Sequence, residues 1–266
     1  MTPDFLQSAF SLKGRTALVA GASRGIGLAI ARGVAGAGAR TILAARSMDD
    51  LEREAASIRD AGGRAEAAHL DMTDRDSIRR FAAAYPDVDI LFNVAGTNRR
   101  RRFETYSREE YDWLLQTNLH GIVELTQLVG GRMVQHGKGG KVITIGSLMS
   151  VLGLPYMTVY AITKSALAGM TRALAAEWAR HNIQVNCIVP GFIRTDLNRH
   201  LWEIPAMVEW VKSCEANPEI GKPEDVAPLA VFLASRGSDY ITGQLIAVDG
   251  GFTTTATWPM EPLTTG

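Results

Sequence analysis

The stretch RTALVAGASRGIGLAIARGVAGAGA, residues 15–39, decides the fold, because a strand and a helix meet in it across a glycine-rich turn. The apolar run at 16–20 predicts a buried strand, and the small and apolar residues at 24–35 predict the helix that follows. The same order repeats, with strands expected at 40–46, 64–72, 88–96, 141–147 and 183–189 and a last helix and strand within 222–251. This alternation predicts an α/β fold, a Rossmann-type doubly wound parallel sheet of about seven strands with helices on both faces. No linker, low-complexity tract or repeat interrupts it, so we expect a single domain over 1–266.

The turn between the first strand and helix has the glycine spacing G-x-x-x-G-x-G, formed by Gly21, Gly25 and Gly27. Glycines here permit a tight turn, a close approach of backbone N–H groups to a pyrophosphate, and close packing of helix on strand. The helix N-terminus adds unpaired N–H groups and a partial positive charge. The turn therefore predicts dinucleotide binding; a tight connection without a ligand is the alternative.

The composition excludes several classes of partner. Lys plus Arg equals Asp plus Glu at 28 each, so no net field recruits nucleic acid or an acidic membrane. Cys187 and Cys214 form no disulfide framework, which favours a reducing compartment. The N-terminus does not resemble a signal peptide, and no run approaches the roughly 18 apolar residues of a membrane span. We expect a cytoplasmic protein with no nucleic-acid or membrane partner and no metal site.

SLMSVLGLPYMTVYAITK, residues 147–164, carries the candidate catalytic groups. Tyr160 and Lys164 are four residues apart, so on a helix they share one face. A phenol has an ordinary pKa of about 10, and the nearby Lys164 ammonium is expected to lower the pKa of Tyr160 towards the working pH. Ser147 ends the apolar strand before it and can hold the oxygen that Tyr160 protonates. The alternative is an amphipathic pair that packs over the edge of the core.

Arginines at the end of the second expected strand favour NADP over NAD. An acidic residue there binds the ribose 2′-OH of NAD, whereas an arginine suits a 2′-phosphate. Residues 44–47 contain no carboxylate but include Arg46, and Arg24 in the glycine turn offers a second guanidinium. Two solvated surface arginines are the alternative reading.

Four consecutive arginines, at 99–102, follow the strand expected at 88–96. Guanidinium groups at the carboxyl end of a strand match carboxylate, phosphate or sulfonate oxygens, which predicts that one or two of them recognise an anionic substrate. A solvated basic turn paired with acids such as Glu104 is the alternative. A nucleic-acid patch is a weaker one, because no basic face accompanies this short run.

Three other segments carry structural expectations. Residues 107–137 predict one long helix capped by Ser107 and Glu110, in whose middle Asn118 is a poor helix former and suggests a small kink. Residues 196–222 are apolar and bounded by Pro and Gly, which fits a lid over a site, although a packed helix pair fits nearly as well. The tail at 252–266 either docks on a neighbouring subunit or is loose.

Taken together, the motifs resemble the short-chain dehydrogenase/reductase family from about residue 12 to residue 251. The matching elements, in order, are GASRGIG at 21–27, Asp71, NVAG at 93–96, Asn118, Ser147, YAITK at 160–164, PGFIRT at 190–195 and VDGG at 248–251. Two positions depart from the family pattern: Ala20 stands where Thr is usual, and NVAG replaces NNAG. Both chiefly support the local backbone, so we expect altered local hydrogen bonding and retained activity.

The resemblance implies a catalytic tetrad of Asn118, Ser147, Tyr160 and Lys164. In that tetrad Tyr160 is the acid/base, Ser147 orients the carbonyl or hydroxyl, Lys164 holds the nicotinamide ribose, and Asn118 holds a water in a proton relay. The cofactor contacts that it implies are Gly21, Ser23, Arg24, Gly25, Ile26, Gly27, Arg46, Asp71 at the adenine, Met72, Asn93, Ala95, Gly96, Tyr160, Lys164, Pro190, Gly191, Ile193 and Thr195. Homotetramers are usual in the family.

Within the family the chain is most similar to gluconate 5-dehydrogenases and related sugar-acid dehydrogenases, in which an arginine-containing loop lies near the substrate carboxylate. The substrate contacts implied here are Arg99, Arg100, Ser147 and Tyr160. The expected activity is NADP-preferring interconversion of a secondary alcohol and a ketone on a sugar acid such as gluconate or 5-ketogluconate. A 3-oxoacyl thioester reductase, or a dehydrogenase of another anionic hydroxy compound, is the alternative, and a non-catalytic dinucleotide-binding scaffold is a more distant one.

Overall fold

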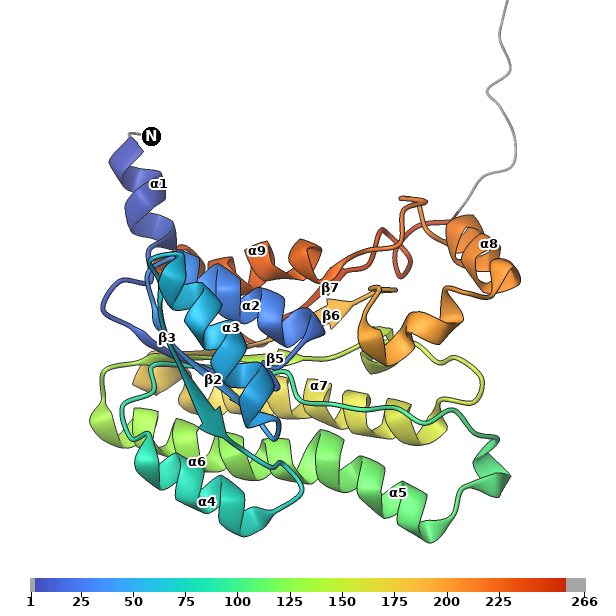
Figure 1. Ribbon diagram of the computed structural model, residues 1–266, viewed down its shortest axis with the longest axis horizontal. Helices are drawn as coiled ribbons and strands as arrows, with labels where there is room; N and C mark the ends of the chain where they lie inside the picture. Colours follow the sequence, from blue (N-terminus) through green and yellow to red (C-terminus); the bar gives the residue numbers. More distant parts are fainter. Residues whose placement is uncertain (1–2, 257–266) are drawn as a thin grey trace, which may run out of the picture.

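Seven parallel strands form one sheet in the computed structural model, which describes residues 3–256 (Figure 1). The strands follow one another across the sheet in the order β3-β2-β1-β4-β5-β6-β7. Their bounds are β1 Thr16–Ala20, β2 Arg40–Ala45, β3 Arg64–His69, β4 Ile90–Asn93, β5 Gly140–Ile145, β6 Ile183–Pro190 and β7 Leu245–Val248. The doubly wound parallel sheet expected from the sequence is confirmed.

The direction of the strand order reverses between β1 and β4. Leu18 of β1 is in register with Ile42 of β2 on one side and with Leu91 of β4 on the other. Connections from the two strands leave to opposite faces, which opens a crevice beyond their carboxyl ends, where open α/β sheets bind ligands. The glycine turn follows β1 and the arginine run follows β4, so both lie at this edge.

Helices cover both faces of the sheet (Figure 1). One face packs against α2 (Gly25–Gly36), α3 (Met48–Asp60) and α9 (Pro223–Ala234), and the other against α4 (Arg75–Ala84), α6 (Gly121–His136) and α7 (Thr158–Trp178). Two apolar cores result, one on each side of the sheet. The remaining helices are α1 (Pro3–Phe10), α5 (Arg108–Leu115), α8 (Pro205–Cys214) and the 3₁₀ turns Phe103–Thr105, Leu148–Ser150, Ala179–His181, Asp196–Leu201 and Arg236–Ser238.

The long helix expected at 107–137 contains a π-helical turn over Gln116–His120, between α5 and α6. Asn118 lies in this turn, and its side chain is fully buried, so the expected irregularity is present at this residue. Gly121 follows at once, and a Cβ there would collide with the carbonyl oxygen of Met72. Insertions of this kind in helices occur frequently at functional sites.

Strand β4 ends at Asn93, three residues before the end of the strand expected at 88–96. Val94 N and Ala95 N both donate to the carbonyl oxygen of Ala20, at 2.9 and 2.8 Å. The chain therefore turns across the end of β1 and cannot continue the ladder. This places the following loop directly over the glycine turn.

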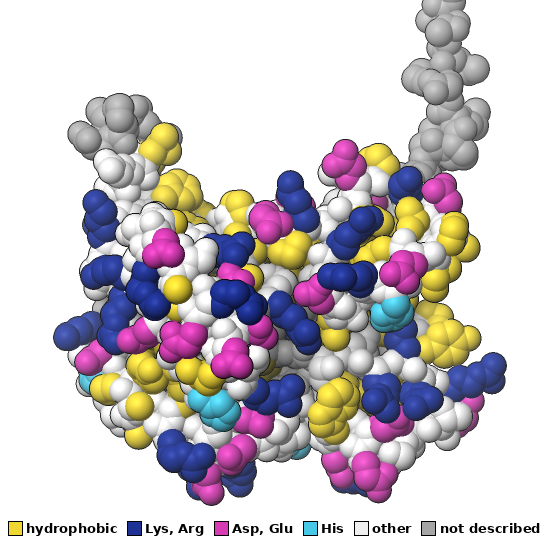
Figure 2. All heavy atoms as spheres, viewed as in Figure 1, with side chains coloured by type: hydrophobic (Ala, Val, Ile, Leu, Met, Phe, Trp, Pro, Cys, Tyr) yellow, Lys and Arg dark blue, Asp and Glu magenta, His cyan; other side chains and the backbone are white. Residues whose placement is uncertain are grey.

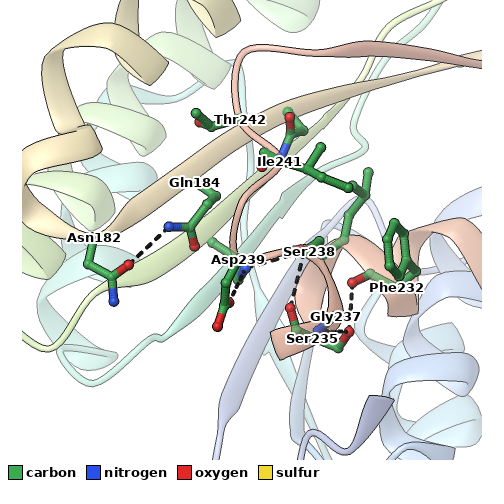
Figure 3. Close-up of polar contacts among 12 residues, drawn as sticks. Asn182, Gln184, Phe232, Ser235, Gly237, Ser238, Asp239, Ile241 and Thr242 are labelled. Atoms are coloured by element: carbon green, nitrogen blue, oxygen red, sulfur yellow. Dashed lines mark hydrogen bonds and ion pairs between the residues drawn. The ribbon is translucent and has the colours of Figure 1, made fainter. Parts of the chain in front are cut away.

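The amino edge of the sheet is fixed by polar contacts far from that crevice (Figure 3). The buried Lys141 at the start of β5 donates to Asp239 Oδ1 at 2.8 Å and to Ser238 Oγ at 3.2 Å. Nearby, Asn186 Nδ2 donates to the carbonyl oxygen of Ile241 at 2.7 Å. These contacts hold the connection between α9 and β7 in place. Buried polar groups are satisfied here by a structural network.

Positive and negative side chains are interspersed on the face shown in Figure 2, without a continuous patch of one sign. Over residues 3–256, no helix has both the length and the apolar character that a bilayer span requires. The tail expectation falls largely on 257–266, which lie outside the described residues.

Candidate active site

The glycine turn after β1 has a shape that only glycine permits. Gly21 has φ +101°, and a Cβ there would lie 2.6 Å from Ala95 N. Gly25 has φ +57°, and a Cβ on Gly27 would collide with the carbonyl oxygen of Gly21. The turn thus packs tightly against the loop after β4 and the start of α2. Because its glycines have no side chains, a ligand can approach the backbone of the turn closely from the solvent side.

The N-terminus of α2 is open to an anion. Arg24 is its N-cap residue, its side chain makes no capping hydrogen bond, and the first turn contains no acidic residue. Thr195, in the loop after β6, lies with Cγ2 3.5 Å from the position of a Cβ on Gly25. Unpaired N–H groups and the positive end of the helix together form a cradle that fits a pyrophosphate.

The ends of β2 and β3 bring Arg46 and Asp71 into electrostatic contact. Partial burial alone would raise the pKa of Asp71. Hydrogen bonds from Thr73 N (2.8 Å) and Thr73 Oγ1 (2.7 Å), together with the charge of Arg46, outweigh that effect and hold the pKa below its ordinary value. Arg24 and Arg46 are exposed, and neither forms an ion pair with another residue of 3–256. Their guanidinium groups are therefore available to a phosphate ester beside the half-buried Asp71.

Other residues expected at the cofactor lie along the same edge: Ser23 and Ile26 in the glycine turn, Met72 after β3, Ala95 and Gly96 after β4, and Pro190 and Gly191 at the end of β6. Asn93 differs, because its side chain is fully buried and donates from Nδ2 to Thr126 Oγ1 at 2.9 Å. Ile193 is also buried, in a parallel bridge with Gly221. These two side chains are therefore buried in the protein behind the surface of the crevice.

Tyr160 and Lys164 lie one turn apart in α7, as their spacing predicts. The Nζ of Lys164 lies 5.6 Å from the centroid of the Tyr160 ring and donates to the carbonyl oxygen of Ile145 at 2.8 Å. The side chain is almost fully buried, with 3% of the residue exposed. A Cβ on Gly96 would lie 3.5 Å from Nζ, so the missing side chain leaves space beside the ammonium group.

Asn118 connects the π-turn to the loop after β4. Its Oδ1 accepts from Thr97 N and its Nδ2 donates to the carbonyl oxygen of Thr97, both at 2.8 Å. Nδ2 also lies 3.5 Å from Thr163 Oγ1 in α7. Because both amide atoms are engaged, Asn118 holds the start of the arginine run against the helix that carries Tyr160.

Ser147 follows β5, and its Oγ accepts from Met149 N at 3.2 Å, which leaves the hydroxyl proton free for a further acceptor. Ser150, which the motif analysis missed, accepts from Ser147 N at 3.2 Å and donates to the carbonyl oxygen of Lys164 at 3.0 Å. The only signal in the sequence is the three-residue spacing of the two serines, which is typical of a cap.

The arginine run divides into two groups. Arg99 and Arg101 form ion pairs with Glu110 at 2.7 and 3.0 Å, so the acid that pairs with the run is Glu110 and not Glu104. Arg100 forms no ion pair with a residue of the described chain; partial burial lowers the pKa of its guanidinium, and the nearby Tyr160 opposes that shift. Of the two arginines expected at the substrate, Arg99 is engaged in an ion pair, whereas Arg100 is not and interacts with the charge of Tyr160.

The segment 196–222 forms a 3₁₀ turn and α8 beside the crevice (Figure 1). Phe192 lies at the centre of an aromatic cluster, with ring centroids 6.3 Å from Trp202, 5.6 Å from Trp210 and 5.3 Å from Phe252. After α8, Glu215 is buried, with 4% of the residue exposed. Burial, and then the charge of Asp249, raise the pKa of Glu215 to about 7.

The chain is similar to known oxidoreductases over most of its length. A family described as Enoyl-(Acyl carrier protein) reductase matches residues 21–253. Gluconate 5-dehydrogenase of Gluconobacter oxydans (strain 621H) is 37% identical over 250 residues, which cover 92% of this chain and 96% of that protein. A 3-oxoacyl-[acyl-carrier-protein] reductase of Chlamydia trachomatis (serovar D) is 36% identical over 245 residues, 90% of this chain and 98% of that protein. The crystal structure of a gluconate 5-dehydrogenase from Burkholderia cenocepacia J2315, in complex with NADP and tartrate, has a TM-score of 0.91 at 35% identity and covers 94% of this chain and 100% of that one.

Proposed function

The chain belongs to the short-chain dehydrogenase/reductase family of oxidoreductases, and we propose that it interconverts a secondary alcohol and a ketone on a sugar acid with NADP(H). The observation that carries the substrate class is Arg100, a guanidinium that has no ion-pair partner in the described chain and interacts with the charge of Tyr160. The similarity to gluconate 5-dehydrogenases, one of them solved with tartrate bound, supports a hydroxylated acid.

In the proposed reaction Tyr160 gives its proton to the substrate oxygen during reduction and takes it back during oxidation. The bound cofactor supplies or accepts the hydride. Lys164 places a positive charge 5.6 Å from the centroid of the Tyr160 ring. Ser147 donates its free hydroxyl proton to the same oxygen and fixes the orientation of the carbonyl. Asn118 holds Thr97 and thereby the wall of the site, and a water beside it would relay protons to Lys164.

Several features support NADP as the preferred cofactor. Arg24 and Arg46 are exposed and free of ion pairs within residues 3–256, and no carboxylate occupies 44–47. A guanidinium binds a 2′-phosphate well, whereas NAD recognition uses an acid at this position. NADP is bound in the structure of the related gluconate 5-dehydrogenase. The segment 196–222 would act as the lid, held by the aromatic cluster around Phe192.

A 3-oxoacyl thioester reductase is the second candidate. The similarity to a 3-oxoacyl-[acyl-carrier-protein] reductase, nearly as high as that to gluconate 5-dehydrogenase, favours it. The chemistry at Tyr160 would be the same, and only the role of Arg100 would differ. The two candidate functions therefore differ in the substrate and share the same proton transfer at Tyr160.

Initial-rate kinetics test the proposal. The purified protein is assayed with NADPH and with NADH on 5-keto-D-gluconate and on an acetoacetyl thioester, and with NADP on D-gluconate. Turnover of the sugar acid with NADPH preferred supports the proposal. Turnover of the thioester alone would be consistent with the roles of Ser147, Tyr160 and Lys164. It would refute the proposal that Arg100 binds a substrate carboxylate.

A further inference from the structure

Glu110 binds two of the four consecutive arginines with one carboxylate. Its Oε1 accepts from Arg99 Nη1 at 2.7 Å and from Arg101 Nη2 at 3.0 Å and Nε at 3.2 Å. Only 17% of the Glu110 side chain is exposed. The hydrogen bonds from Arg99, and then from Arg101, lower the pKa of Glu110 to about 2, so the carboxylate is charged near neutral pH. The contact is thus a charge-assisted clamp and not an incidental surface pair.

The clamp leaves the arginine between its two partners without an ion-pair partner among residues 3–256. Arg99 and Arg101 share one acceptor, so their side chains leave the backbone on the same side. Residues 97–102 form neither helix nor strand, so side-chain contacts and not a backbone ladder hold this run. Burial lowers the pKa of the Arg100 guanidinium and Tyr160 raises it, which indicates that the two side chains interact.

Other contacts make this arrangement rigid. Arg101 N donates to the carbonyl oxygen of Tyr156 at 3.1 Å, in the loop that leads to α7, and the Tyr106 hydroxyl donates to the carbonyl oxygen of Arg99. Glu110 itself is fixed in the first turn of α5, because it forms a capping box with Ser107. The clamp is therefore anchored to a helix, while Arg100 is held by its neighbours alone.

We propose that Glu110 is a positioning residue: by clamping Arg99 and Arg101 it holds the arginine run beside the loop that leads to α7 and leaves the unpaired Arg100 available to a substrate carboxylate at Tyr160. The inference rests on the proposed function. Arg100 and Arg102 keep guanidinium groups free of ion pairs within residues 3–256, and a free guanidinium matches a carboxylate through two parallel hydrogen bonds. Glu110 does not contact the reacting atoms and acts only through Arg100.

The variant Glu110→Gln tests this role. Glutamine keeps the size of the side chain and can still accept from Ser107 N, but it loses the charge that holds the two arginines. We expect KM for 5-keto-D-gluconate to rise about tenfold with kcat changed less than about twofold, because ground-state and transition-state binding weaken equally. For the uncharged ketose D-fructose, kcat/KM should change by less than about twofold, since no carboxylate is recognised.

Glu109→Gln is the matched control. Glu109 lies in the same first turn and carries the same charge, but it pairs with neither arginine. This variant should leave KM for 5-keto-D-gluconate within about twofold of the wild type, since no group that orients Arg100 is altered. An equal rise of KM in both glutamine variants would show that net charge, and not the clamp, is responsible, and would overturn the proposal.

A double-mutant cycle with Arg100→Ala separates positioning from a general structural effect. If Glu110 acts through Arg100, Glu110→Gln should raise KM no further when Arg100 is already absent. Additive effects overturn the positioning role. An unchanged KM in Glu110→Gln, with a wild type that reduces 5-keto-D-gluconate, overturns that role alone. A wild type that reduces only the thioester overturns the proposed function and this inference together.

Discussion

Ser150 donates its hydroxyl proton to the main-chain carbonyl oxygen of Lys164 at 3.0 Å, from a 3₁₀ turn fourteen residues earlier in the chain. The same oxygen atom of Ser150 accepts from the backbone N–H of Ser147 at 3.2 Å. One small side chain thus joins the end of β5 to α7. The relative position of Ser147 and Lys164 depends on it.

Ser150→Ala should lower kcat about tenfold, because a small displacement of Ser147 weakens its bond to the substrate oxygen. The free energy of unfolding should fall by only about 1 kcal/mol, the contribution of an ordinary hydrogen bond. Ser165→Ala is the matched control, since Ser165 Oγ donates to the carbonyl oxygen of Met149 at 3.1 Å between the same two elements. Steady-state kinetics and urea unfolding measure both quantities, and equal losses of kcat in the two variants would contradict the prediction.

Tyr160→Phe should lower kcat by about a hundredfold or more, the usual contribution of a positioned acid/base. The affinity for NADPH should stay within about twofold, since the ring and Lys164 remain in place. NADPH fluorescence titration and initial rates provide the two measurements. The exposed Tyr156 offers a control, as Tyr156→Phe should leave both unchanged. Activity retained in Tyr160→Phe would refute the acid/base role.

Arg46→Ala should raise KM for NADP about tenfold or more and leave KM for NAD within about twofold, because a charge-assisted contact to the 2′-phosphate is lost. Arg53→Ala removes another exposed arginine, one that pairs with Asp50 at 2.7 Å, and should change neither KM. An equal rise of KM for NADP and for NAD after Arg46→Ala would contradict a contact with the 2′-phosphate. It would indicate that Arg46 supports the fold.

The Glu215 carboxyl group should make stability fall as the pH rises. Burial and Asp249 raise its pKa to about 7, so the folded protein keeps the proton in a range where the unfolded chain, with its ordinary pKa near 4.5, has lost it. The resulting loss of stability is absent below the pKa of the unfolded chain. It grows as the pH rises from that pKa to the pKa of the folded protein, and it is complete above about pH 7.

Glu215→Gln should therefore be more stable than the wild type at about pH 8, by up to about 3 kcal/mol, and should differ little at about pH 4.5. Urea unfolding at the two pH values measures the difference. Glu219→Gln, at an exposed position, should show no such pH dependence. Equal stability of Glu215→Gln and the wild type at the higher pH would mean that the group is ionised in the folded protein without cost.

Much of the active-site edge follows from local patterns in the sequence. The glycine spacing at 21–27 predicts the turn because positive φ angles and close backbone contacts exclude side chains there. Tyr160 and Lys164 meet because a helix brings residues four apart onto one face. The alternation of strands and helices predicts the parallel sheet, whose carboxyl ends then gather the motifs at one crevice.

The tertiary structure alone decided how neighbouring candidates divide their roles. Arg99 and Arg100 are equivalent in the sequence, and only the position of Glu110, eleven residues beyond Arg99, separates the ion-paired arginine from the free one. Asn93 matches a cofactor motif, yet its side chain is buried against Thr126, and Ser150 carries no motif but bridges Ser147 and Lys164. Local sequence patterns predict backbone conformation, because backbone conformation depends mainly on adjacent residues. Side-chain partners and desolvation depend on which distant segments pack together, and these are set only when the chain has folded.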